Sequence, residues 1–311
     1  MTVVSNDPSW WSTIKTLRFF SYFVVASSTA MIYDWALTFG QEVELIWRQR
    51  WSLMTVLYIG VRYIGMPYAV ISLLFTLPSV PKPDAVSNIM HAIEAWIGVV
   101  VNAMLCVIMI ARLHAMYMRS RKILIFLVVV FISLTTASVT IAAIQTSHSS
   151  GEEYILSGTY AWNEEGGSVH LESDTWILGT VWEVLALCLA VWIAAKHFRE
   201  LRRPSMGWTV GDCFSVLIKS HVIYFASFVI SACLILGNLS PAIMDSASVG
   251  AEVYAGICQF VSLMQMFVLG PRLILSVREY HAELVAGSDE GTGMTTMSFQ
   301  ERVHVSTSSG V

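Results

Sequence analysis

Long apolar stretches are the feature that most constrains what this chain can fold into. A helix needs about 20 mostly apolar residues to cross a hydrocarbon core of about 30 Å. Seven stretches qualify, at approximately residues 16–38, 52–76, 91–113, 123–145, 175–196, 217–239 and 251–272. The second and third contain ionisable residues, so the pattern also allows a count of six. The sequence therefore predicts an all-α, polytopic membrane protein built as a seven-transmembrane-helix bundle.

Composition supports a bilayer as the main surrounding of the chain. Only 13% of the 311 residues are charged and 55% are hydrophobic, whereas a soluble domain carries about 25% charged residues. The net charge of -4 is small and dispersed, without the basic stripe that nucleic-acid binding requires. We therefore expect a multi-pass membrane location, with the plasma membrane as the default compartment, and no nucleic-acid partner.

Lysine and arginine gather in the odd-numbered loops, which fixes the expected orientation. Loop two has only Lys82, and loops four and six have neither residue type. The odd loops hold Arg48, Arg50, Arg112, Arg119, Arg121, Lys122, Lys196, Arg199, Arg202 and Arg203. Because basic loops stay in the cytosol, we expect the N-terminus outside and the C-terminus inside. Lys15 and Arg18, beside the first stretch, argue mildly against this orientation.

The predicted layout has three parts. Residues 1–15 form an extracellular N-terminal tail, residues 16–286 the transmembrane domain, and residues 287–311 a disordered cytosolic tail rich in Ser, Thr and Gly. Gly270-Pro271 is expected to cut the last helix, because proline lacks the N–H and clashes with the preceding turn. The following residues, 272–284, would then form a short helix on the inner leaflet.

Arg62 is the most informative single residue. It lies about ten residues, or roughly 15 Å at 1.5 Å per residue, into the second stretch. A charge at that depth costs at least ~2.5 kcal/mol, so it should face the bundle and find a carboxylate. Glu183 lies at nearly the same depth, and Asp34 is shallower but within reach. Such a polar centre either fixes helix packing alone or serves a ligand, an ion or a conformational switch.

Two loops carry further candidate features. The fourth loop, residues 146–174, is long and acidic, and we expect a solvated, hairpin-like loop. Its charges also allow a cap over a ligand pocket or a surface that attracts cations. In loop five the string RRPS ends at Ser205, which suits a basic-directed kinase.

No motif in the sequence indicates an enzyme. There is no H-E-x-x-H, G-x-S-x-G, P-loop or G-x-G-x-x-G. His114, His197 and His221 fall near expected inner helix ends, but nothing in their spacing requires zinc. The five cysteines form no C-x-x-C pair and are expected to pack as small apolar residues. We predict no catalytic residue, no metal site and no cofactor.

Residues 33–63, YDWALTFGQEVELIWRQRWSLMTVLYIGVRY, resemble the defining segment of a basidiomycete fungal family of multi-pass membrane proteins without an assigned function. The positions that carry the resemblance are Tyr33, Asp34, Leu37, Thr38, Glu42, Val43, Ile46, Trp47, Trp51, Ser52, Arg62 and Tyr63. The closing GPRLILSVREYHAEL also looks like the end of many members. Glu44 and Phe39-Gly40 depart from the usual pattern. The resemblance implies a domain of unknown function and supplies no activity or catalytic residue.

The layout is also similar to that of a G-protein-coupled receptor, although only by analogy. The third stretch ends in ARLHAMY rather than in Asp-Arg-Tyr, and the seventh ends in LGPRLIL rather than in Asn-Pro-x-x-Tyr. These two receptor motifs are therefore missing. We expect a receptor-like or sensor-like protein with an unknown ligand and a cytosolic signalling partner at loops three and five. A small-solute or ion transporter is the alternative, and an intramembrane metal-dependent hydrolase comes third.

Overall fold

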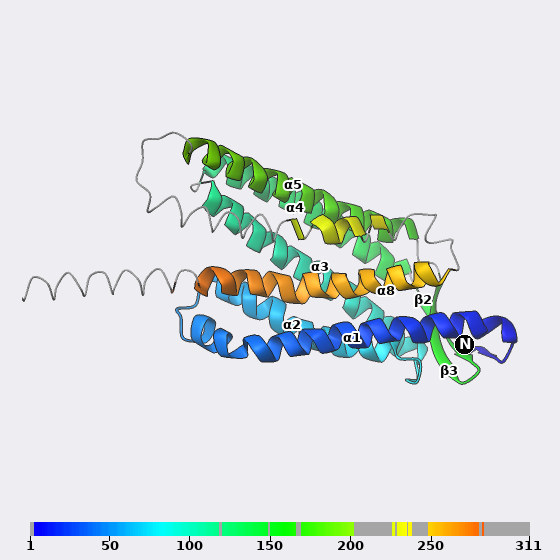
Figure 1. Cartoon of the computed structure of the whole chain (residues 1–311). Helices are drawn as coiled ribbons and strands as arrows, with labels where there is room; N and C mark the ends of the chain where they lie inside the picture. The colour runs from blue at the N-terminus through cyan, green and yellow to red at the C-terminus, as the bar shows by residue number, and fades with distance from the viewer. Residues whose placement is uncertain are drawn as a thin grey trace, which may run out of the picture.

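Long helices dominate the computed structural model, which describes residues 3–117, 120–148, 150–165, 169–201, 226–227, 229–234, 236–237, 248–279 and 282. They are α1 (Trp11–Glu42), α2 (Leu53–Thr76), α3 (Asp84–Met116), α4 (Arg121–His148), α5 (Val169–Leu201) and α8 (Val249–Met264). The helices run along a common direction, with a small sheet at one end of the bundle (Figure 1).

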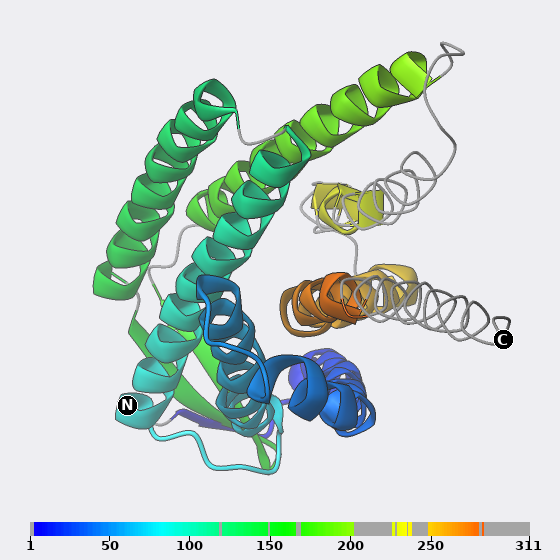
Figure 2. The same ribbon diagram turned by 90° about the vertical axis from the view of Figure 1, so that its left-hand side faces the viewer.

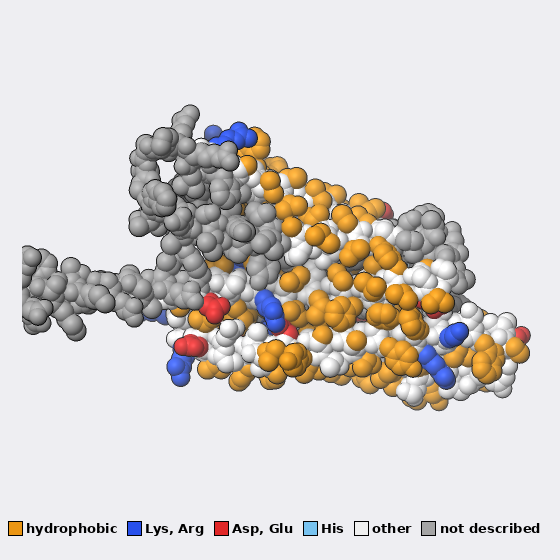
Figure 3. Space-filling model, viewed as in Figure 1, with side chains coloured by type: hydrophobic (Ala, Val, Ile, Leu, Met, Phe, Trp, Pro, Cys, Tyr) orange, Lys and Arg blue, Asp and Glu red, His pale blue; other side chains and the backbone are white. Residues whose placement is uncertain are grey.

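Five of the described helices are long and apolar enough to cross a membrane. They are Leu53–Thr76, Asp84–Met116, Arg121–His148, Asp174–Ile193 and Val249–Glu279. Hydrophobic side chains dominate the face in Figure 3 between its two ends. The fold is therefore all-α and membrane-like, as predicted. The stretch at 217–239 lies mostly outside the described residues, as do Ser205 and the tail at 287–311.

Most of the helices extend beyond the apolar stretches because polar residues continue them, whereas α2 keeps almost the expected bounds. α1 runs from Trp11 to Glu42 instead of over 16–38. α2 begins where Ser52 caps it: Ser52 Oγ accepts from the Thr55 N–H, and Thr55 Oγ1 accepts from the Ser52 N–H. Such a reciprocal capping box satisfies backbone donors that a helix start leaves unpaired.

The prediction that Gly270-Pro271 cuts the last helix is wrong. The helix that begins as α8 passes through a π-helical turn, Gln265–Leu269, and continues to Glu279. Proline removes one N–H and crowds the carbonyl four residues earlier. A wider turn just before the proline can absorb that crowding. Residues 271–279 are therefore part of the spanning helix rather than a separate helix on the inner leaflet.

A three-stranded sheet covers one end of the bundle. It consists of β1 (Val3–Ser5), β2 (Ser150–Leu156) and β3 (Thr159–Glu165) in the order β1-β2-β3. β2 and β3 form an antiparallel hairpin, and β1 pairs with β2 in parallel. The two hairpin-turn residues have positive φ angles, 47° at Ser157 and 79° at Gly158, as tight hairpin turns require. The N-terminal segment is thus a strand of this sheet rather than a free tail.

The hairpin is fixed to the loop between α2 and α3. The Lys82 N–H donates to Glu153 Oε1 at 2.6 Å, and the Glu153 N–H donates to Asp84 Oδ1 at 2.7 Å. The Gly151 N–H donates to Asn88 Oδ1 at 3.0 Å. The fourth loop therefore forms the expected hairpin, but Glu153 is buried in this contact, so the expectation that the loop's acidic residues are solvated is wrong for Glu153. The sequence pattern did not show that the acidic loop has a partner.

Two groups of helices share α3. In the first, α1, α2, α3 and the last helix bury Ile46, Tyr58, Val61 and Phe267. In the second, α3, α4 and α5 bury Leu113, Leu127, Trp182 and Ala186. Figure 2 shows α3 between α4 and α5 on one side and α1, α2 and α8 on the other. The first group holds the polar centre described below.

The contact between Lys82 and the hairpin predicts a pH dependence. Burial lowers the pKa of Lys82 to about 8 from 10.5, against the nearby Glu153 carboxylate, which raises it. Between about pH 8 and pH 10.5 the unfolded chain then binds more protons, so folding stability rises with pH. We expect the thermal midpoint in detergent to rise over this range in the wild-type protein and to rise less in Lys82→Met.

The exposed Lys15 provides the matched control. Lys15→Met should keep the wild-type slope of thermal midpoint against pH. An identical slope in Lys82→Met would show that this lysine is not buried against the hairpin in the folded protein.

Candidate functional site

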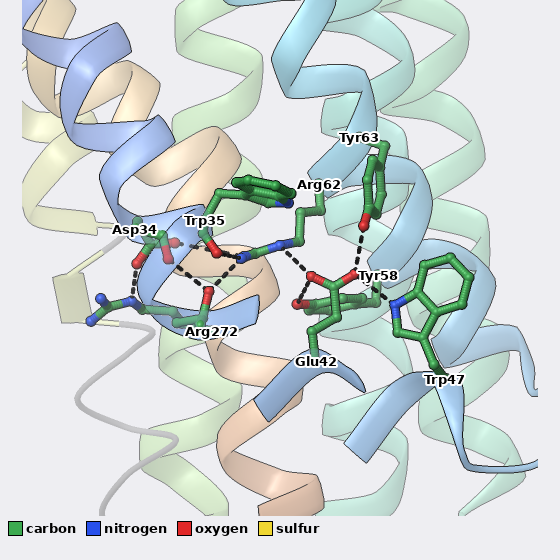
Figure 4. A network of polar contacts seen from close by, with 9 residues as sticks. Asp34, Trp35, Glu42, Trp47, Tyr58, Arg62, Tyr63 and Arg272 are labelled. Atoms are coloured by element: carbon green, nitrogen blue, oxygen red, sulfur yellow. Dashed lines mark hydrogen bonds and ion pairs between the residues drawn. The ribbon is translucent and has the colours of Figure 1, made fainter. Parts of the chain in front are cut away.

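A buried arginine of α2 lies between two carboxylates of α1 (Figure 4). Arg62 Nε is 2.8 Å from Glu42 Oε2, and Arg62 Nη1 is 3.6 Å from Asp34 Oδ2. Arg62 Nη2 donates to the Trp35 carbonyl at 3.1 Å and to Thr38 Oγ1. The charged side chains are nearly inaccessible, 3% exposed for Arg62 and 0% for Glu42. The guanidinium is therefore paired on each of its sides.

Glu42 is the best-satisfied charge of the network. Besides the ion pair with Arg62, its Oε1 accepts from Trp47 Nε1 and from the Tyr63 hydroxyl, each at 3.0 Å. Its Oε2 accepts from the Tyr58 hydroxyl at 3.3 Å. A carboxylate offers about four lone-pair sites, and each oxygen of Glu42 has two partners. This arrangement holds the end of α1 and the start of α2 in one geometry.

Helical spacing explains why the sequence brings these groups together. Asp34, Thr38 and Glu42 are four residues apart, so they lie on one face of α1. Tyr58 and Arg62 have the same spacing on α2. A π-helical turn, Val43–Trp47, closes α1 and returns the Trp47 indole to Glu42, five residues earlier.

The last helix joins the network through a second arginine. Arg272 Nε is 2.5 Å from Asp34 Oδ1. Its side chain is 47% exposed, whereas that of Asp34 is 7% exposed. Asp34 thus holds one buried and one half-exposed guanidinium. Two carboxylates and two guanidiniums balance in charge, which reduces the cost of placing them in an apolar surrounding.

Further arginines fix the same end of the last helix. Arg278 donates to the Leu45 carbonyl at 2.8 Å and to Thr55 Oγ1 at 2.6 Å. Arg112 of α3 donates to the Leu273 carbonyl. These contacts tie residues 272–278 to the α1–α2 turn and to α3. Residues 272–278 therefore have a structural role.

Of the two predicted partners of Arg62, Asp34 contacts it and Glu183 does not. Glu183 Oε1 accepts from Gln265 Nε2 at 2.5 Å, between α5 and the last helix. Depth alone suggested Glu183, but α2 packs on α1 and α3, so its arginine faces the carboxylates of α1. Glu183 Oε2 and Gln265 Oε1 have no hydrogen-bond partner within the described part of the chain.

Sequence reasoning missed Glu42 and Arg272 as partners. Glu42 lies beyond the expected helix end at residue 38, so it was not considered as an intramembrane carboxylate. The four-residue spacing from Asp34 through Thr38 to Glu42 was the available signal. Arg272 follows the glycine-proline pair that was expected to end the helix. Its place in the same helix, in contact with Asp34, was therefore not predicted.

The remaining residues of the 33–63 segment fall into two groups, one exposed on the outside of the helices and one buried or half-buried. The apolar side chains of Tyr33, Leu37, Trp47 and Trp51 are exposed on the outside of the helices. Ile46 is fully buried, Val43 is half-buried and Ser52 caps α2. The segment therefore combines a buried polar face with an apolar outer surface.

The candidate metal ligands do not form a described site. The side chains of His197 and His221 lie outside the described residues, and only His114 can be placed. Within the described ranges, no group of three or more His, Cys, Asp or Glu side chains could hold a metal ion.

The polar network coincides with a region that is similar to a known family. Residues 22–67 match the family model described as a family of unknown function (DUF6533). No curated protein matches the chain. Every charged member of the network except Arg272 lies in the matched region.

The two arginines that share Asp34 should differ in their effect on stability. Arg62→Ala leaves two buried carboxylates without their common partner and should cost about 3–5 kcal/mol of unfolding free energy. Arg272→Ala leaves Asp34 paired with Arg62 and removes a half-exposed pair, so it should cost about 1 kcal/mol or less. Unfolding of the purified variants in mixed micelles measures both values.

A double-mutant cycle separates the pairing from general damage. Glu42→Gln combined with Arg62→Ala should destabilise by less than the sum of the two single changes, because the groups are in contact. Strictly additive changes in unfolding free energy would contradict the paired arrangement. Equal losses of unfolding free energy in Arg62→Ala and Arg272→Ala would contradict it as well.

Proposed function

We propose that this protein is a receptor-like or sensor-like membrane protein of seven helices, with its N-terminus outside and its C-terminus in the cytosol. α1, with 32 residues, and the stretch at 217–239 supply the two spans beyond the five already described. The pairing of β1 with β2 supports an even number of spans between the N-terminal segment and loop four, because it requires both segments on the same side of the membrane. The basic loops then assign the opposite end to the cytosol.

The observation that carries this proposal is the sharing of Asp34 by two arginines of different exposure. Arg62 is 3% exposed and Arg272 is 47% exposed. Arg272 can therefore leave Asp34 for water while Arg62 stays 3.6 Å from the Asp34 carboxylate. Exposed ion pairs contribute about 0.2–1 kcal/mol, and the 47% exposure of Arg272 lets water replace part of its contact with Asp34, so we expect a small free-energy difference between the two arrangements. A receptor needs a two-state element of this kind, which a ligand can bias.

The proposed output is a change at the cytosolic end of the last helix. Residues 272–278 contact the α1–α2 turn and α3, so movement there alters the surface beside loops one and three. A signalling partner would bind basic loops three and five, and Ser205 in loop five would regulate that contact when phosphorylated. The role is not catalytic, and the plasma membrane is the proposed compartment.

Distance measurements test the two-state junction. Spin labels at Gln49→Cys and Glu279→Cys, with the other reactive cysteines replaced, report the separation of the α1–α2 turn and the last helix. We expect Arg272→Gln to add a second, longer distance, while Arg121→Gln, at a basic residue outside the junction, keeps the wild-type distribution. An unchanged distribution in Arg272→Gln would remove the basis of the proposed sensor.

Accessibility of terminal tags tests the orientation. A tag after Val311 should bind antibody only after cells are permeabilised, whereas a tag before Met1 should bind on intact cells. The reverse result would invert the topology.

A transporter is the second candidate, favoured by the contact between Glu183 and Gln265. Each of these residues has one buried oxygen without a hydrogen-bond partner among the described residues. A carboxyl group in this position can bind a proton or a small cation, as intramembrane acids of transporters do. Flux into proteoliposomes that is lost in Glu183→Gln but kept in Arg272→Gln would favour transport over sensing.

A further inference from the structure

A carboxyl group and an amide meet at the contact between α5 and the last helix. Gln265 Nε2 donates to Glu183 Oε1 at 2.5 Å. The second oxygen of each group, Glu183 Oε2 and Gln265 Oε1, is buried and has no hydrogen-bond partner within the described part of the chain. A buried polar atom without a partner is costly and rare in folded proteins. Two acceptors on one pair of side chains therefore lack a donor.

One proton on Glu183 would satisfy both of these oxygens. A protonated carboxyl group has an O–H donor and keeps an acceptor, whereas an ionised one only accepts. A primary amide also carries a donor and an acceptor, so an acid and an amide can pair through two hydrogen bonds. The bond from Gln265 Nε2 to Glu183 Oε1 is one of the two. The second would run from the Glu183 Oε2–H to Gln265 Oε1, the two atoms left without a partner.

The surroundings of Glu183 favour the neutral form. The residue lies at the centre of the span Asp174–Ile193, where a charge without a partner is expensive. Burial and the hydrogen bond from Gln265 dominate its environment. The titratable group of α3 that interacts with Glu183 is the Cys106 thiol, which is itself uncharged when protonated. Glu94 of the same helix lies about three turns before Cys106.

The other charged and titratable residues of the elements around α5 have partners of their own or lie apart. Arg112 of α3 donates to a carbonyl of the last helix, and Arg272 belongs to the ion pairs described above. Cys258 of the last helix donates to a backbone carbonyl. The charged residues of α4 lie at its two ends. The described residues between 226 and 237 contain one titratable group, the exposed Cys233.

A proton suits this pair better than a metal cation does. Ca²⁺ and Mg²⁺ take six or more oxygen ligands, whereas the pair offers two free oxygens. Within the part of the chain that the structure describes, no group of three or more His, Cys, Asp or Glu side chains could hold a metal ion. The nearby cavity lined by Cys106 and Trp182 has a volume of about 20 Å³, which holds about one water. A proton needs no cavity.

We propose that the proton is the ligand of the proposed sensor, bound by Glu183 in a neutral acid–amide pair with Gln265. The proton site stands on its own contacts, and only its coupling to the Asp34 junction rests on the proposed function. Gln265 begins the π-helical turn of the last helix, and Arg272 lies about two turns further along. The pair therefore joins α5 to the helix that ends in the junction.

Release of the proton would weaken the contact between α5 and the last helix. The O–H bond of Glu183 breaks, its electron pair stays on the carboxylate, and the proton passes to water. The hydrogen bond to Gln265 Oε1 is then lost, and an unpaired charge is left at the centre of the span. Movement of the last helix away from α5 relieves this state, and Arg272 moves with the same helix.

Two substitutions separate the proton from the hydrogen bonds. Glu183→Gln creates a pair of amides, which keeps both hydrogen bonds without a titratable proton. Gln265→Leu removes both hydrogen bonds. Glu44→Gln makes the same chemical change as Glu183→Gln at an exposed carboxylate and is the matched control.

Infrared spectroscopy of the full chain in nanodiscs tests the protonation of Glu183. An ordinary glutamate is ionised at neutral pH. We expect a C=O band of a protonated carboxyl group in the wild-type protein that shifts in heavy water, is lost in Glu183→Gln and remains in Glu44→Gln. Gln265→Glu would form an acid pair with two protons and should strengthen the band. Identical carboxyl bands in the wild type and in Glu183→Gln would overturn the site, as would a Gln265→Glu spectrum without a stronger band.

The distance between spin labels at Gln49→Cys and Glu279→Cys tests the coupling. As the pH is raised until the Glu183 band disappears, the wild-type protein should gain a second, longer distance. Glu183→Gln should keep the short distance throughout, and Gln265→Leu should show the longer one already at neutral pH.

The two measurements distinguish failure of the proton as ligand from failure of the sensor. A distance that responds to Arg272→Gln but not to loss of the Glu183 band would support the sensor and overturn the proton as its ligand. A Glu183 band with a distance that responds to neither change would support the proton site and overturn the sensor. A response to Arg272→Gln without any Glu183 band would overturn the proton site alone.

Discussion

The arrangement of α1, α2 and the last helix depends on keeping one guanidinium neutralised where water is excluded. A charge inside the bundle is tolerated only when it is paired, and Arg62 reaches both Glu42 and Asp34. This requirement fixes the rotation of α1 and α2 about their axes, since the carboxylates and the arginine must face one another. Apolar packing around Tyr58 and Val61 then completes the contact.

The sequence predicted the helices well and their contacts less well. Runs of apolar residues locate spans because backbone groups in lipid must pair within their own helix. The need of Arg62 for a carboxylate was also predictable, and Asp34 was one of two candidates. Which carboxylate it meets depends on which helix packs against α2, and that is a tertiary property. Glu42 could have been found from its spacing to Asp34 and Thr38, whereas Arg272 could not, because Pro271 concealed the continuation of the helix.

Contacts between loops were beyond prediction for a different reason. The acidic fourth loop contains the hairpin, but Lys82, Asp84 and Asn88 that hold it are far away in sequence. Polar loop composition is compatible with either solvation or docking, because both satisfy hydrogen bonds. The partner of β1 was hidden in the same way. Three residues are too short to indicate a strand unless their neighbour is known.

The parallel pairing of β1 with β2 has a consequence for biosynthesis. Val3 lies opposite Tyr154, so the first strand emerges from the ribosome long before its neighbour. β1, which is joined to the start of α1, cannot pair until α4 and the β2–β3 hairpin have been synthesised. The sheet can therefore close only after residues up to Glu165, about half of the 311-residue chain, have been made. Once formed, the sheet joins the N-terminal strand to the middle of the chain by backbone hydrogen bonds.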